Sequence, residues 1–149
     1  MGAVHERPVG DAWTPAVWFL PTLELAGVGR NGLVASAIAA DHLQLSRQVT
    51  SRTQGMAAEI AGLSRADLYL DGASALPARL DFETHPTGTV RLALPVEIRY
   101  SGWHVQSGIE IPRHIERWVA NVRQLAIDIT DTEINPPLPA GEFELGGGQ

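Results

Sequence analysis

The chain has 149 residues, of which 44% are hydrophobic and 19% are charged, and its formal net charge at pH 7 is −6. This composition predicts a globular domain and excludes an intrinsically disordered chain. The absence of cysteine excludes disulfides, thiolate metal sites and a cysteine nucleophile. All 11 basic residues are scattered arginines, so the acidic chain is not expected to bind nucleic acid or an anionic lipid surface.

The chain begins with a segment, residues 1–14, that is predicted to be a flexible lead-in. Residues 15–28 contain one or two strand-like runs interrupted by Pro21, which favours an edge strand. The residues of Gly29–Gly32 are of types that favour a turn, and a second apolar run, Leu33 to His42, follows them. We therefore expect a hairpin here, with a small-residue helix as the alternative for the second run.

The spacing of the apolar residues along the chain changes after this hairpin. Between Ser46 and Leu63 the apolar residues recur every three or four positions, which predicts an amphipathic helix. Ser46 is suited to cap the start of this helix, and Gly62 lies where helices commonly end.

Four runs with a period of two residues follow, which is typical of an antiparallel sheet covered on one face. They comprise residues 67–71, 75–83, 90–100 and 103–111. In the second run the apolar side is predicted to be Leu76, Ala78, Leu80 and Phe82, and the other side Pro77, Arg79, Asp81 and Glu83.

The C-terminal part is predicted to contain a second amphipathic helix, Pro112 to Ala126, and a last short strand at 127–134. The expected fold class is therefore α+β, an antiparallel meander with two amphipathic helices packed on one face as a two-layer sandwich. The single domain is expected to span residues 15–134, with a Pro/Gly-rich disordered tail at 135–149.

Motifs for catalysis or metal binding are weak. The glycines of "GVGRNG", Gly27, Gly29 and Gly32, match a dinucleotide-binding pattern, but a hairpin turn explains them better because no parallel strand and acidic residue follow. None of the five histidines has a partner at metal-ligand spacing, and no serine lies in a G-x-S-x-G elbow. We expect no catalytic residues, no metal and no cofactor.

The polar side of the predicted sheet carries both signs of charge. Asp81, Glu83, Glu97 and Glu110 are interleaved with Arg79, Arg91 and Arg99, which predicts cross-strand ion pairs and lowered carboxylate pKa values. Of the four tryptophans, Trp103 and Trp118 are predicted to be core residues, whereas Trp13 and Trp18 are candidates to anchor a partner. The candidate partner-binding residues are Trp13, Trp18, Arg79, Asp81, Arg91, Arg99 and His104.

The order of elements from Leu33 to Ile127, and above all Gly72 followed by "PARLDF" (Pro77 to Phe82), resembles the PsbP-like superfamily. That group includes DcrB-related proteins and the adaptor-chaperones of type VI secretion. The resemblance implies a non-enzymatic adaptor or chaperone for a secreted or membrane-associated protein client, acting as a homodimer. A second, fainter resemblance, through "VRLALPVEIRY", "IPRHIERWVANVRQL" and "IDITDTEI", is to the alkaline-shock envelope proteins.

A third reading is a ligand-binding domain or enzyme in which the sheet curls around an apolar pocket. The N-terminus is too polar for a signal peptide, and no run of apolar residues is long enough to span a membrane. We therefore expect a cytoplasmic protein-binding module without membrane insertion.

Overall fold

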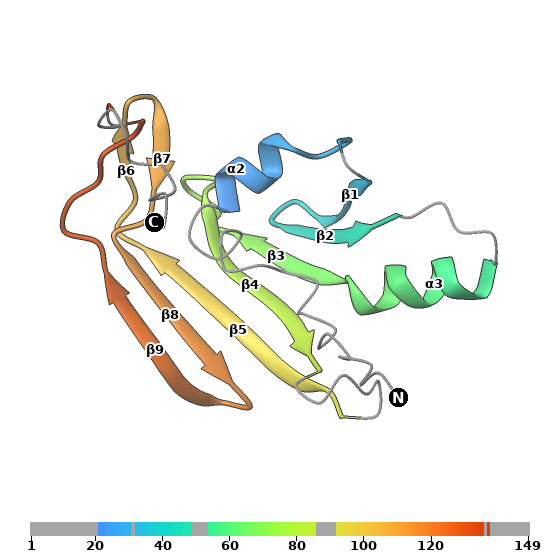
Figure 1. Cartoon of the computed structure of the whole chain (residues 1–149). Helices are drawn as coiled ribbons and strands as arrows, with labels where there is room; N and C mark the ends of the chain where they lie inside the picture. Colours follow the sequence, from blue (N-terminus) through green and yellow to red (C-terminus); the bar gives the residue numbers. More distant parts are fainter. Residues whose placement is uncertain (1–20, 31, 49–53, 86–91, 136, 138–149) are drawn as a thin grey trace, which may run out of the picture.

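The computed structural model describes residues 21–30, 32–48, 54–85, 92–135 and 137. Within these residues the chain forms a seven-stranded antiparallel sheet and a separate two-stranded hairpin. The sheet has the order β1 (Leu33–Ala39), β2 (His42–Arg47), β3 (Ala66–Leu70), β4 (Pro77–Thr84), β5 (Leu94–Ser101), β8 (His114–Val119) and β9 (Val122–Asp128). The hairpin consists of β6 (His104–Gln106) and β7 (Ile109–Ile111) and extends beyond the end of the sheet where β5 ends and β8 begins (Figure 1).

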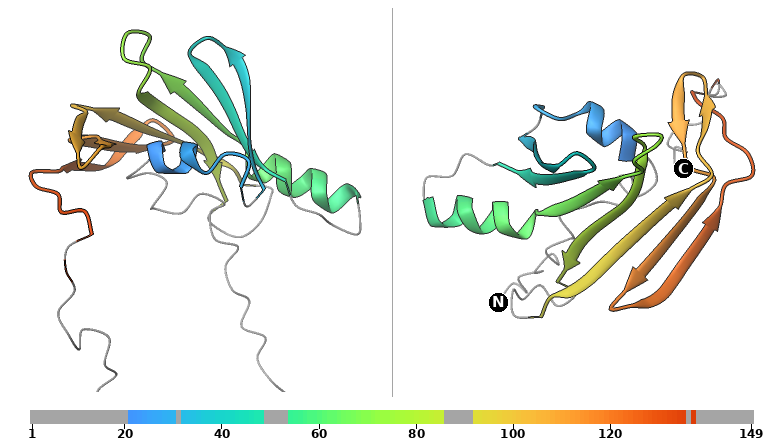
Figure 2. Two further views of the ribbon diagram at one scale, coloured as in Figure 1. Left: turned by 90° about the horizontal axis from the view of Figure 1, so that it is seen from above. Right: turned by 180° about the vertical axis from the view of Figure 1, so that it is seen from behind.

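The predicted fold class is wrong, because the structure is mostly β. The helices that the structure describes are α2 (Pro21–Ala26) and α3 (Gln54–Leu63), and neither is long and apolar enough to cross a membrane. Figure 2 shows the sheet from above, with α2 on one side of it and α3 extending from the β3 end. The two-layer sandwich with two helices on one face is therefore not formed.

The predicted helix from Pro112 to Ala126 is the main source of this error. The segment is instead the hairpin β8–β9, and its turn residues Ala120 and Asn121 have φ angles of +46° and +64°. Two consecutive positive φ angles are typical of the type I′ turn, whose twist matches that of a hairpin. The β8–β9 register skips Gln124 of β9, so Val122 and Leu125 lie on the same side although they are three residues apart. With Trp118 beside Val119 in β8, the apolar residues imitate a helical period. The predicted last strand at 127–134 is likewise corrected, because β9 ends at Asp128.

The N-terminal elements also differ from the prediction. Pro21 begins helix α2 rather than interrupting a strand, which suits the fixed φ of proline at a first helical position. The hairpin is made by β1 and β2, which turn at Ala40 and Asp41. Ser46 lies inside β2 and caps no helix, and α3 starts only at Gln54.

The turn at Gly29–Gly32 is confirmed at its two glycines, which have φ angles of +83° and +74°. A Cβ atom at position 32 would lie 2.3 Å from the carbonyl oxygen of Gln48, so only glycine fits this close approach. At the same end of β2, the Ser64 hydroxyl accepts a 2.9 Å hydrogen bond from the Arg47 backbone N–H. This bond joins the end of α3 to β2.

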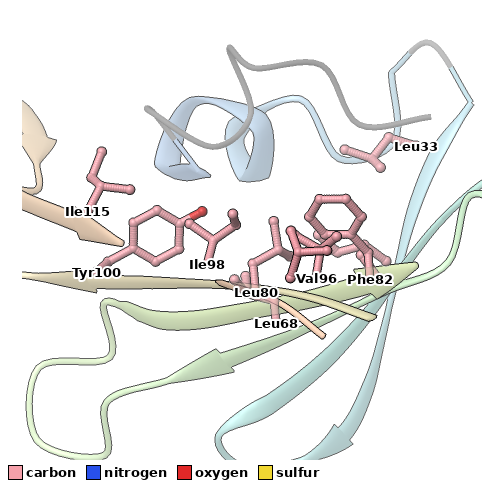
Figure 3. Packing of buried hydrophobic residues seen from close by; sticks show 11 residues of the cluster. Leu33, Leu68, Leu80, Phe82, Val96, Ile98, Tyr100 and Ile115 are labelled. Carbon is pink, nitrogen blue, oxygen red and sulfur yellow. The ribbon is translucent and has the colours of Figure 1, made fainter. Parts of the chain in front are cut away.

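The core lies on one face of the sheet, as Figure 3 shows for its central side chains. Its buried members come from six strands: Leu33, Leu45, Ala66, Leu68, Leu80, Phe82, Val96, Ile98, Tyr100, Ile115 and Val119. Leu25 of α2 and Trp103 of the β5–β6 connection pack against them, and the Trp103 indole N–H donates a 3.0 Å hydrogen bond to the Pro77 carbonyl. The predicted apolar side of β4 is thus confirmed at Leu80 and Phe82, and the core placement of Trp103 is confirmed as partial burial.

Candidate functional site

The opposite side of the sheet carries polar, charged and aromatic side chains, and we call it the charged face. Because directly opposed residues of paired strands share a face, the strand register defines it. Its members are His42, Gln44, Asp67, Tyr69, Arg79, Asp81, Glu97, Arg99, Glu116, Trp118 and Arg123. These residues lie on β2, β3, β4, β5, β8 and β9.

The charges of this face are sorted into two rows that run across the strands. Asp67 lies opposite Asp81, and Asp81 lies opposite Glu97, which forms an acidic row over β3, β4 and β5. Two residues along the strands, Arg79 lies opposite Arg99, which forms an arginine pair over β4 and β5. Like charges that oppose each other directly are unfavourable, so each row needs compensation from outside itself.

The ion pairs that offset these like charges form within single strands rather than between neighbouring strands. Arg79 Nε lies 3.2 Å from Asp81 Oδ2 within β4, and Arg99 Nε pairs with Glu97 Oε1 within β5. The predicted cross-strand pairing of these four residues is therefore wrong, because the register sets arginine against arginine and carboxylate against carboxylate. Cross-strand pairs form at the margins, where His42 Nε2 lies 2.8 Å from Asp67 Oδ1 and Arg123 Nη1 lies 2.8 Å from Glu116 Oε1.

Both arginines of the pair stack on aromatic rings. The Arg79 guanidinium lies 4.1 Å from the centroid of the Tyr69 ring, which itself stacks on His42 at 4.4 Å between centroids. The Arg99 guanidinium lies 4.7 Å from the centroid of the Trp118 ring. Such cation–π contacts restrict the guanidinium groups to defined positions.

Trp118 is the residue of this face whose predicted place is wrong. The sequence predicts it in the core, but it lies opposite Glu97 on the charged face and donates a 3.0 Å hydrogen bond from its indole N–H to Glu116 Oε2. Counting β8 with a period of two from Ile115 would have identified this position, because Glu116 and Trp118 then share the polar side.

A hollow of about 800 Å³ lies at the end of the charged face where α3 ends and β8 turns into β9. The acidic row and Trp118 line it, together with Arg65, Arg99, Glu83 and Asn121. Its lining thus holds four carboxylates and two arginines. Burial raises the pKa of the Asp81 carboxyl, and this effect outweighs the nearby Arg79 charge, while Glu97 and Asp67 add to it. The predicted lowering of the carboxylate pKa is therefore wrong at Asp81.

The structure brings together three of the predicted partner-binding residues, Arg79, Asp81 and Arg99. His104 does not join them, because it lies on β6, outside the seven-stranded sheet. Trp13, Trp18 and Arg91 lie outside the described residues. Sequence reasoning missed Asp67, Tyr69 and Trp118 as members of the same face.

The described part of the chain offers little for a metal or a dinucleotide. None of its residues form a group of three or more histidine, aspartate or glutamate side chains placed to hold a metal ion. The glycines at 27, 29 and 32 precede β1, whose pairing with β2 is antiparallel, so the strand–helix–parallel strand unit of a dinucleotide site is not formed there.

Comparisons with family models, with curated proteins and with solved structures found no match to this chain.

Proposed function

We propose that the chain is a protein-binding module that contacts its partner through the charged face of the sheet. The single observation that carries this proposal is the hollow of about 800 Å³ on that face, lined by charged groups of both signs and by Trp118. Arginine, tyrosine and tryptophan are the residue types most enriched in the energetically important parts of protein interfaces. All three residue types occur on the charged face of this sheet.

The charge balance favours a protein over other macromolecules. The acidic row and the net charge of −6 oppose a phosphate backbone or an anionic membrane surface. A protein surface can present both signs of charge and complement both rows of the face. The proposal rests on this face and not on the PsbP-like resemblance, since β8 and β9 occupy the segment where that resemblance implies a helix.

A ligand-binding pocket among the apolar side chains is the competing function. Of the core residues, Phe82 and Val96 line the hollow, and its other lining residues lie outside the core cluster. We therefore base the proposal on the charged face.

The test is to block the hollow without removing a charge. Ala93 is exposed and lines the hollow, so Ala93→Trp places a large side chain there. Ala40→Trp is the matched control, because Ala40 is exposed at the β1–β2 turn, at the other end of the strands. Tagged wild-type and variant chains are used to capture proteins from the native host, and the captured proteins are quantified by mass spectrometry.

We expect a stoichiometric partner that the wild-type chain and Ala40→Trp retain and Ala93→Trp loses. Equal retention by all three chains would exclude the hollow as the binding surface. Release of a small molecule on denaturation, with no protein captured, would support the ligand-binding alternative.

A further inference from the structure

The arginine pair is the feature of the charged face with the most specific recognition chemistry. Arg79 and Arg99 are directly opposed on neighbouring strands, which places their Cα atoms about 5 Å apart. Each guanidinium is held over an aromatic ring, and each uses its Nε atom toward a carboxylate of its own strand. Two guanidinium groups are therefore fixed side by side at one place on the sheet.

The outer edges of these guanidinium groups remain available. Among the residues that the structure describes, no hydrogen bond or ion pair involves an Nη atom of Arg79 or Arg99. The two side chains are also 41% and 52% exposed. Guanidinium Nη groups bind carboxylates and phosphates in a planar, bidentate geometry. Stacking on Tyr69 and Trp118 reduces the conformational entropy lost when such a ligand binds.

The neighbouring acidic row determines which anion fits. It lies two residues further along the strands, and therefore about 7 Å away. A polyanion such as a nucleic acid would meet this row wherever it extended beyond the arginine pair. A segment with both signs of charge would place its carboxylate on the arginine pair and a basic side chain on Asp67, Asp81 or Glu97.

We propose that Arg79 and Arg99 together bind a glutamate or aspartate carboxylate of the partner, in a segment that also presents a lysine or arginine to the acidic row. This inference rests on the proposed protein-binding function and specifies the chemistry of the partner. It assigns the specificity of the charged face to the arginine pair, and it makes mixed charge, rather than negative charge, the recognised property.

Synthetic ligands test the inference without the natural partner. The probes are twelve-residue peptides of alternating glutamate and lysine, of glutamate alone and of lysine alone, and a twelve-nucleotide single-stranded DNA. Binding to the full chain is measured by calorimetry at low ionic strength, and the arginine side-chain N–H signals are followed by NMR. The face variant is Arg79→Gln with Arg99→Gln. A control with the same change in net charge is Arg30→Gln with Arg113→Gln, since both residues are exposed and neither belongs to the charged face.

We expect the alternating peptide to bind more tightly than the other three probes and to shift the Arg79 and Arg99 signals. The face variant should lose at least about tenfold in affinity, as expected for lost charge-assisted hydrogen bonds, while the control variant should bind like the wild type. An Arg99→Lys chain keeps the charge but loses the planar fork, so intermediate affinity would support bidentate recognition.

Three outcomes would overturn the inference. The first is equal affinity of the face variant and the control variant. The second is DNA or the glutamate peptide binding as tightly as the alternating peptide, which would indicate an anion site without the mixed-charge requirement. The third is no saturable binding of any peptide. None of these results would decide the protein-binding proposal itself, which the Ala93→Trp experiment tests separately.

Discussion

Replacement of Ala120 by glycine distinguishes the β8–β9 hairpin from a helix by the sign of the stability change. Ala120 has a φ angle of +46° and donates a 2.9 Å hydrogen bond from its backbone N–H to the Pro95 carbonyl. A left-handed conformation costs an L-residue about 1–2 kcal/mol. Glycine removes this cost and keeps the hydrogen bond. It also increases the conformational entropy of the unfolded chain, which lowers the free energy of unfolding by about 0.4–1 kcal/mol.

The net expectation for Ala120→Gly is a gain of about 0.5–1 kcal/mol in the free energy of unfolding. In the middle of a helix from Pro112 to Ala126, the same change would lose about 1 kcal/mol. The assay is urea unfolding at 25 °C, followed by far-ultraviolet circular dichroism and analysed by linear extrapolation. Ala126→Gly serves as the control, because Ala126 lies within β9 and glycine in a strand costs about 0.5–1 kcal/mol. A loss in both variants would refute the hairpin assignment.

Three further predictions concern the core and one exposed ion pair. Ile98 is 0% exposed and Ile38 is 56% exposed. In urea unfolding, Ile98→Ala should lower the free energy of unfolding by about 3–4 kcal/mol and Ile38→Ala by less than about 1 kcal/mol. Equal losses in the two variants would contradict this difference in burial. The Tyr100 hydroxyl is buried and has no hydrogen-bond partner within the described residues, so Tyr100→Phe should raise the unfolding free energy by about 1 kcal/mol, and a decrease would reveal a partner. The hydrogen bond from His114 to Asp128 raises the pKa of His114. The contribution of this pair to the stability of the fold is therefore complete below the unfolded pKa of about 6.5, and it is lost as the pH rises through the higher folded pKa. Asp128→Asn should lower the His114 pKa in an NMR titration, and an unchanged pKa would contradict the pairing.

The central strands could be predicted from the sequence because their alternation is regular. Residues such as Leu80, Phe82, Val96 and Ile98 are buried with a strict period of two, and a sheet covered on one face requires that period. The charged side of β4 and β5 follows from the same alternation. Alternation alone is therefore enough to place Arg79, Asp81 and Arg99 on one surface.

The C-terminal hairpin could not be predicted in the same way, for two physical reasons. Its turn uses Ala120 and Asn121 at positive φ, without the glycine that usually marks such turns. The register skips Gln124 in β9, which places Val122 and Leu125 on one side at a spacing of three, and Trp118 adds an apolar residue on the other side of β8. Local periodicity then favours a helix, although pairing with β5 stabilises strands.

The pairing pattern of the charged face also could not be predicted from the sequence. Alternation predicts which residues share a face, but only the register shows which residues are opposed. Here the register places Arg79 against Arg99 and Asp81 against Glu97. With the same composition, a shift of two residues in the β4–β5 register would have opposed Arg79 to Glu97 in one direction, or Asp81 to Arg99 in the other.

The strand order has a consequence for how the protein folds. Every strand of the seven-stranded sheet pairs only with strands adjacent to it in the chain, apart from the short β6–β7 hairpin between β5 and β8. Each pairing therefore joins segments that are close in the sequence, the longest connection being residues 48–65 between β2 and β3. The entropy cost of loop closure grows with loop length. Among sheet proteins, such local pairing favours rapid folding, because no step must first bring distant segments together. The sheet can grow by adding one strand at a time, and the charged face is complete only when β8 has joined β5 and β9 has joined β8.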